Sequence, residues 1–137
     1  MIQRIQTLWM LLASAAAAIS FKFPFYSGTN KEGVASYNLL ADKDHFVLML
    51  VTIVVAVLPF ISIFLFKNRT IQLRLCLVAM LVEAVLIFLY YRETTTFQTG
   101  TFSLTSILHP AILVCLFLAI RGINRDNKII KDSDRLR

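Results

Sequence analysis

The feature that most constrains this chain is an uninterrupted apolar run from Phe46 to Phe66. The run contains no charged residue and is about 21 residues long, so as a helix rising about 1.5 Å per residue it covers roughly 30 Å. That length matches the hydrocarbon core of a bilayer, and such a run is typical of a transmembrane helix. Pro59 lies inside it and predicts a kink, which neighbouring helices tolerate in a membrane.

Three further apolar runs predict three more spans. The bounds of all four are 7–25, 46–66, 75–91 and 102–120, and a basic tail follows at 121–137. The first run also resembles a cleavable signal peptide, because Arg4 precedes it and small residues occupy 16–18. Apolar residues continue past them to Phe25, which favours a retained helix. A cleaved first segment, leaving three spans, is the alternative.

The distribution of basic residues predicts the orientation, because Lys and Arg collect in the cytoplasmic segments of membrane proteins. With four spans, about ten basic residues fall on one side of the membrane and about four on the other. The first group is Arg4, Lys67, Arg69, Arg74, Arg121, Arg125, Lys128, Lys131, Arg135 and Arg137, and the second is Lys22, Lys31, Lys43 and Arg92. The sequence therefore predicts an all-α, four-helix transmembrane bundle, a single domain over 1–137 with both termini cytoplasmic.

The connections between spans are predicted to be loops. Segment 26–45 is polar, with Gly28, Asn30 and Gly33 marking turns. Segment 92–101 is rich in Thr and is predicted to be a short connection on the outer side.

Glu83 is the one charged residue of the third run. A charged group at the centre of a membrane helix costs about 2.5–3.5 kcal/mol, so Glu83 should face protein or water rather than lipid. His109 lies at a similar depth, about 17 Å against 12 Å from the cytoplasmic ends of the two spans, and is the expected partner. Pro110 follows it and predicts a second kink. Three roles stay open for Glu83: a structural anchor, a subunit contact, and proton or ion handling.

The tail carries a stripe of basic residues at helical spacing. Its members are Arg121, Arg125, Lys128, Lys131 and Arg135. They recur at steps of three or four residues, so a helix continuing from the fourth span would place them on one face. On anionic lipid headgroups such a stripe would gain about 1 kcal/mol per basic residue. Ordinary positive-inside charge is the alternative interpretation.

Other functions are not indicated. The net charge of +6 is explained by cytoplasmic Lys and Arg, so a nucleic-acid partner is not expected. Cys76 and Cys115 lie inside apolar runs and are expected to be packing residues. His45 and His109 fall in different segments and make a poor metal site. No catalytic motif is present in the sequence, which predicts a non-enzyme without metal or cofactor.

The opening MIQRIQTLWMLLA resembles the start of an uncharacterised family of small bacterial integral membrane proteins, domain-of-unknown-function family 4293. Its most distinctive stretch here is MIQRIQ, and the resemblance extends over the whole chain. Members of that family are similarly short, with four apolar segments and a basic tail. The family is typical of Bacteroidota, which implies a bacterial inner membrane. The resemblance implies no activity and no functional residues.

These features lead to three functional hypotheses. The first is a non-enzymatic accessory or scaffold subunit of an inner-membrane assembly, bound to a membrane protein partner or to copies of itself. The Ala-rich first helix and Glu83 would then form association surfaces. The alternative is a small oligomeric transporter or channel that uses Glu83 and His109. A membrane enzyme with the same pair as acid and base is the third.

Overall fold

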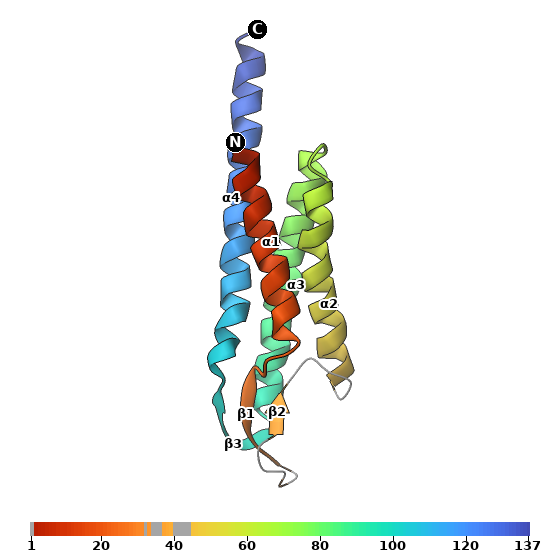
Figure 1. The fold of residues 1–137 in the computed structure, drawn as a ribbon, viewed down its shortest axis with the longest axis vertical. Coiled ribbons are helices and arrows are strands. Elements are labelled where there is room, and N and C mark those ends of the chain that lie inside the picture. The colour runs from red at the N-terminus through yellow and green to blue at the C-terminus, as the bar shows by residue number, and fades with distance from the viewer. Residues whose placement is uncertain (1, 32, 34–36, 40–44) are drawn as a thin grey trace.

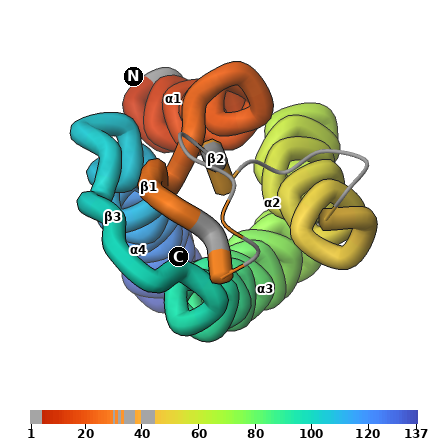
Figure 2. Tube along the Cα trace, turned by 90° about the horizontal axis from the view of Figure 1, so that it is seen from below, coloured from red at the N-terminus to blue at the C-terminus, as the bar shows by residue number. Residues whose placement is uncertain are grey.

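Four helices form an antiparallel bundle in the part of the chain that the computed structural model describes, residues 2–31, 33, 37–39 and 45–137. They are α1 (Ile2–Ser20), α2 (Phe46–Phe64), α3 (Arg69–Thr94) and α4 (Leu108–Arg135). Each packs against its neighbours in the chain, and α4 packs against α1, so the helices form a closed ring (Figure 2). Both termini and the turn between α2 and α3 lie at one end of the bundle (Figure 1). We call this the terminal end.

Each helix buries a stripe of residues that recur at alternating steps of three and four. The stripes are Gln6, Met10, Ala13, Ala17 and Ser20 of α1; Leu48, Thr52, Val55, Pro59 and Ser62 of α2; Gln72, Cys76, Ala79, Glu83, Leu86 and Tyr90 of α3; and His109, Ile112, Leu116, Ala119, Ile123 and Asp126 of α4. This repeat of about 3.5 residues is that of coiled-coil-like bundles.

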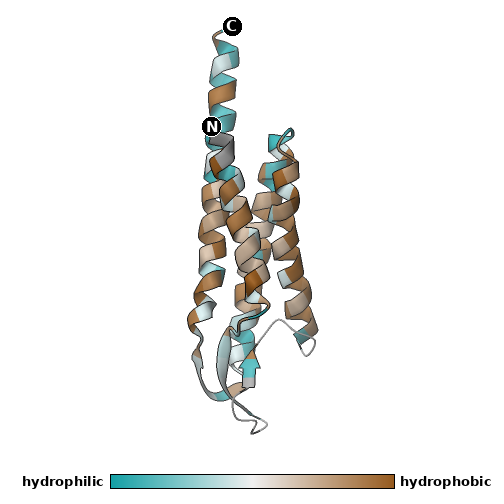
Figure 3. Ribbon diagram, in the orientation of Figure 1, coloured by the Kyte–Doolittle hydropathy of each residue, from teal (hydrophilic) through white to brown (hydrophobic). Residues whose placement is uncertain are grey.

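The outside of the bundle is apolar, and brown, hydrophobic residues dominate the helices in Figure 3. Three helices in the described part are long and apolar enough to cross a membrane: α2, α3, and Leu104–Arg135, which joins α4 to the 3-10 turn η2 (Leu104–Ile107). The apolar part of α1, Ile5–Ser20, is shorter. Three of the four predicted spans thus meet this criterion by length and composition.

The helix bounds differ from those predicted from apolar runs. The first helix ends at Ser20 rather than near residue 25, before a bend that contains Pro24. The third extends beyond 75–91 at both ends, because polar residues continue it. The fourth begins at Leu108 rather than 102 and continues through the tail to Arg135.

A small antiparallel sheet closes the other end of the bundle, which we call the sheet end. It has the order β2-β1-β3, with β1 at Tyr26–Asn30, β2 at Tyr37–Leu39 and β3 at Phe97–Phe102. The prediction of an all-α chain with polar loops at 26–45 and 92–101 is therefore wrong in this region. Gly33 has a φ of +83°, as expected of a turn glycine, whereas Gly28 and Asn30 lie within β1. Lys43 lies outside the described residues.

The sheet brings the α1–α2 connection and the α3–α4 connection together, and their backbones approach each other closely. Gly28 of β1 lies directly opposite Gly100 of β3. A Cβ atom added at Gly28 would lie 2.1 Å from the Thr99 carbonyl oxygen and 2.5 Å from the Gly100 Cα. Glycine is needed here because the backbones leave no room for a side chain.

Candidate functional site: a buried acid–imidazole pair

The two residues predicted to be partners, Glu83 and His109, are in contact. His109 Nδ1 lies 2.9 Å from Glu83 Oε1. The residues are 0% and 3% exposed, so the pair is enclosed by the chain itself. Because Glu83 is turned inward, the expectation that it forms part of an association surface is wrong.

The pair joins the middle of one helix to the start of another. Glu83 follows Arg69, the first residue of α3, by 14 positions and precedes Thr94, the last, by 11. His109, by contrast, is the second residue of α4. The sequence predicted that His109 lies well inside the fourth span. In the structure, α4 begins at Leu108, only one residue before His109.

Pro110 starts a helix rather than kinking one, so the predicted kink at this residue is wrong. It lies in the first turn of α4, where the backbone N–H groups have no partner within the helix in any case. The carbonyl oxygen of Ser106, four residues before Pro110, accepts a hydrogen bond from the Leu108 N–H. Pro59 lies inside α2 as predicted and is buried there.

One oxygen of the pair has no hydrogen-bond partner. Among the described residues, Glu83 Oε2 is a fully buried side-chain oxygen to which no group donates. An unpaired buried acceptor costs about 1–3 kcal/mol, and more if it is charged. The hydrogen bonding of the pair is therefore incomplete: Glu83 Oε1 is paired with the imidazole, whereas Oε2 is not.

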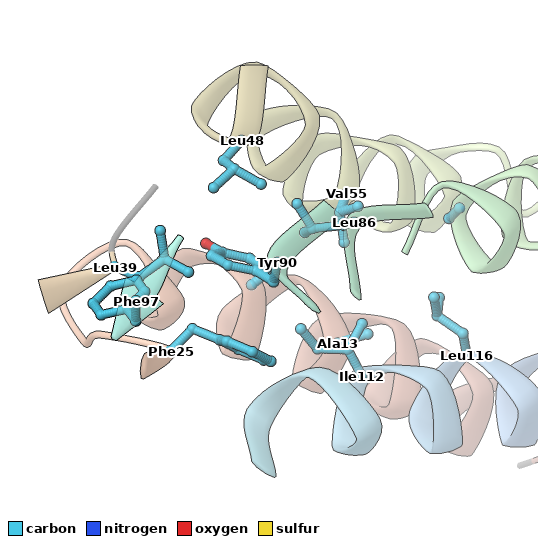
Figure 4. Packing of buried hydrophobic residues seen from close by; sticks show 12 residues of the cluster. Ala13, Phe25, Leu39, Leu48, Val55, Leu86, Tyr90, Phe97, Ile112 and Leu116 are labelled. Atoms are coloured by element: carbon cyan, nitrogen blue, oxygen red, sulfur yellow. The ribbon is translucent and has the colours of Figure 1, made fainter. Parts of the chain in front are cut away.

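Aromatic rings cover the pair toward the sheet end. The Phe25 ring stacks on the Tyr90 ring at a centroid distance of 4.6 Å, and Figure 4 shows the two side by side. Both rings contact the His109 imidazole, with distances between ring centroids of 5.4 Å for Phe25 and 5.0 Å for Tyr90. Phe102 of β3 packs edge-on against Phe25 at 5.8 Å. Phe25 and Tyr90 thus cover the imidazole, and Phe102 of the sheet supports Phe25.

A second polar cluster lies toward the terminal end. Gln6 Nε2 donates to Asp126 Oδ2 at 2.6 Å, and both residues are buried. Gln72 Nε2 donates to the Ser62 carbonyl oxygen at 3.1 Å. Sequence reasoning missed this cluster, although Gln6 belongs to the MIQRIQ opening and the spacing of the buried stripes would have placed it inward.

The basic stripe of the tail lies on a continuous helix, as predicted. Its five members are exposed, and α4 extends past the beginning of α1 along its own axis (Figure 1). Ile123 is buried, whereas Ile130 is 44% exposed. The helix leaves the bundle in this direction, so its last residues point away from the apolar part of the molecule, and Arg121 and Arg125 are the members nearest to that part.

The cysteines and possible metal ligands were also located. Cys76 is buried and Cys115 half-buried, and both are free. Among the described residues, no three His, Cys, Asp or Glu side chains are grouped so that they could hold a metal ion.

Comparison with known proteins points to a family rather than to an activity. Neither the curated proteins nor the solved structures give a match. A family model described as a domain of unknown function, DUF4293, matches residues 2–136. The match covers nearly all of the sequence, from Ile2 of the MIQRIQ opening through all four helices and the sheet. This chain therefore belongs to the DUF4293 family.

Proposed function

We propose that this chain is a four-span protein of the bacterial inner membrane, with both termini cytoplasmic, that acts as a non-enzymatic accessory or scaffold subunit of a membrane assembly. The observation that carries the proposal is the closure of the Glu83–His109 pair inside the bundle. A pair enclosed in this way serves as an anchor between helices. The outer surface is then left for contacts with lipid and with other proteins.

The apolar outer surface of the bundle also supports this proposal. Large apolar side chains are exposed along α2 and α3. On α1, Ala13 and Ala17 are used inside the bundle, whereas Ala15 and Ala18 are exposed. Small residues on an outer helix face let a second helix approach closely in lipid. We therefore assign the association surface to the outer face of α1.

The test is to cross-link the protein in its native membrane, extract it in a mild detergent, and identify stoichiometric partners by mass spectrometry. Ala15→Trp should abolish the partner, whereas Val78→Trp, an equally bulky change at an exposed site on α3, should not. Recovery of the lone monomer would overturn the subunit role. Loss of the partner in both variants, or in neither, would overturn the assignment to α1.

A second function, a small oligomeric transporter or channel, is favoured by one specific observation. Glu83 Oε2 is buried and has no hydrogen-bond partner among the described residues, and an ionisable group inside a membrane helix is a common element of proton pathways. In liposomes, a proton-dependent flux should be abolished by Glu83→Gln and retained by Arg74→Gln, an exposed site on the same helix. A wild-type protein without flux, or an unchanged Glu83→Gln variant, would exclude this role.

A further inference from the structure

A pocket lies at the sheet end, in the crevice between the start of α2 and the end of α3. Its volume is about 480 Å³, and the described residues that line it include His45, Phe46, Val47, Arg92 and Glu93. Pockets that bind small ligands have volumes of about 300–1,000 Å³ and combine apolar walls with a few polar groups. This pocket has both properties.

An apolar groove continues from the pocket along α2. Its volume is about 260 Å³, and it shares Phe46 and Val47 with the pocket. It runs on past Leu50 to Val54, with Val82 of α3 on its other side, and the described side chains that line it are all apolar. From Phe46 to Val54 the helix rises about 12 Å. The pocket provides a polar mouth, and the groove continues from it as a long apolar surface. A ligand that fits both parts has a polar head and an apolar chain, as an amphiphile does.

The polar mouth holds one positive and one negative side chain. Arg92 Nη2 lies 3.3 Å from Glu93 Oε1, and the two side chains are 66% and 25% exposed. Their contact is near the surface, so it is weak and can be exchanged for contacts with a ligand. A guanidinium matches a phosphate, and a carboxylate matches a primary ammonium. The mouth is therefore complementary to a headgroup that carries both charges.

We propose that this pocket and groove bind one phospholipid with a phosphoethanolamine headgroup. The phosphate contacts Arg92, the ammonium contacts Glu93, and one acyl chain lies in the groove from Phe46 to Val54. The proposal rests on the membrane-spanning part of the proposed function, but not on the accessory role. It concerns the end of the bundle opposite the basic tail, so the lipid is distinct from any held by Arg121 and Arg125.

The experiment is native mass spectrometry of the full chain in detergent, titrated with phosphatidylethanolamine, phosphatidylcholine or phosphatidylglycerol of identical acyl chains. Phosphatidylethanolamine should bind tightest, because the choline ammonium donates no hydrogen bond to Glu93 and phosphatidylglycerol has no ammonium. Arg92→Gln should weaken binding of all three lipids about tenfold. Arg74→Gln, the matched change at the other end of α3, should have no effect.

Two further variants separate the headgroup from the chain. Glu93→Gln should remove the preference for phosphatidylethanolamine over phosphatidylglycerol while binding persists. Val54→Trp should fill the groove and weaken all three lipids, whereas Val78→Trp should not. Equal binding of the three lipids, or equal effects of Arg92→Gln and Arg74→Gln, would show nonspecific surrounding lipid and overturn the proposal. Membrane integration is scored separately by resistance to extraction at high pH, so its failure is distinguishable from failure of the lipid site.

Discussion

The two ends of the helical bundle bury polar side chains in different surroundings. At the terminal end, Gln6 of α1 donates a hydrogen bond to Asp126 of α4, and this contact is between two side chains. At the sheet end, the Glu83–His109 pair joins α3 to α4 beneath aromatic rings, and β1 and β3 also pair the α1–α2 connection with the α3–α4 connection. The comparison indicates that the sheet end is the more constrained, because backbone pairing supports the side chains there.

The largest expected effect of a substitution is at the Glu83–His109 pair. His109→Ala should lower the free energy of unfolding by about 3–5 kcal/mol, because it leaves a buried carboxyl without its partner. Unfolding in mixed detergent micelles measures this change. In a double-mutant cycle with Glu83→Ala, the two losses should be strongly coupled; simple additivity would mean that the residues do not interact.

The next largest effect should be at the sheet. Gly28→Ala places a methyl group against the backbone of β3, so it should destabilise the protein by about 1–3 kcal/mol. Thr101→Ala, at an exposed position of the same sheet, is the matched control and should be near neutral. A Cys pair at Ser27 and Thr101, which are directly opposite in register, should cross-link in wild-type background and fail to do so with Gly28→Ala.

A smaller effect is expected at the terminal end. Gln6→Leu removes the donor to Asp126 and should cost about 1–2 kcal/mol. The loss should be below that of His109→Ala, because Asp126 lies near the end of the bundle and keeps 7% of its surface exposed. An equal or greater loss in the same micelle assay would reverse the ranking of the two ends.

The smallest effect should come from the aromatic layer. Phe25→Leu keeps most of the apolar volume but removes the stack on Tyr90, so it should cost about 1 kcal/mol. It should also make Glu83 react faster with an apolar carbodiimide, because the covering over His109 is looser. Ile19→Leu, at an exposed position on α1, should change neither quantity, and unchanged Glu83 reactivity in Phe25→Leu would mean that the rings do not cover the pair.

The parts of this structure that could be predicted from the sequence are those with a local signal. Glu83 and His109 each stand out inside an apolar run, so their meeting could be predicted. The pairing of β1 with β3 joins segments that are far apart in the chain. Their Gly and Thr residues are typical of loops, so no local pattern predicts the pairing. Gln6 and Asp126 were missed because the helices extend past the apolar runs that defined them.

The hydrogen bond between Gln6 and Asp126 spans 120 positions of the chain, which sets an order on biosynthesis. During translation, the first helix is complete long before its partner in α4 has been made. Until then the inward stripe of α1, with the Gln6 amide at its edge, lacks the surface of α4 that covers it in the finished bundle. Closing the ring is therefore a late event in synthesis, and a chain that stalls before Asp126 leaves the Gln6 amide without its acceptor.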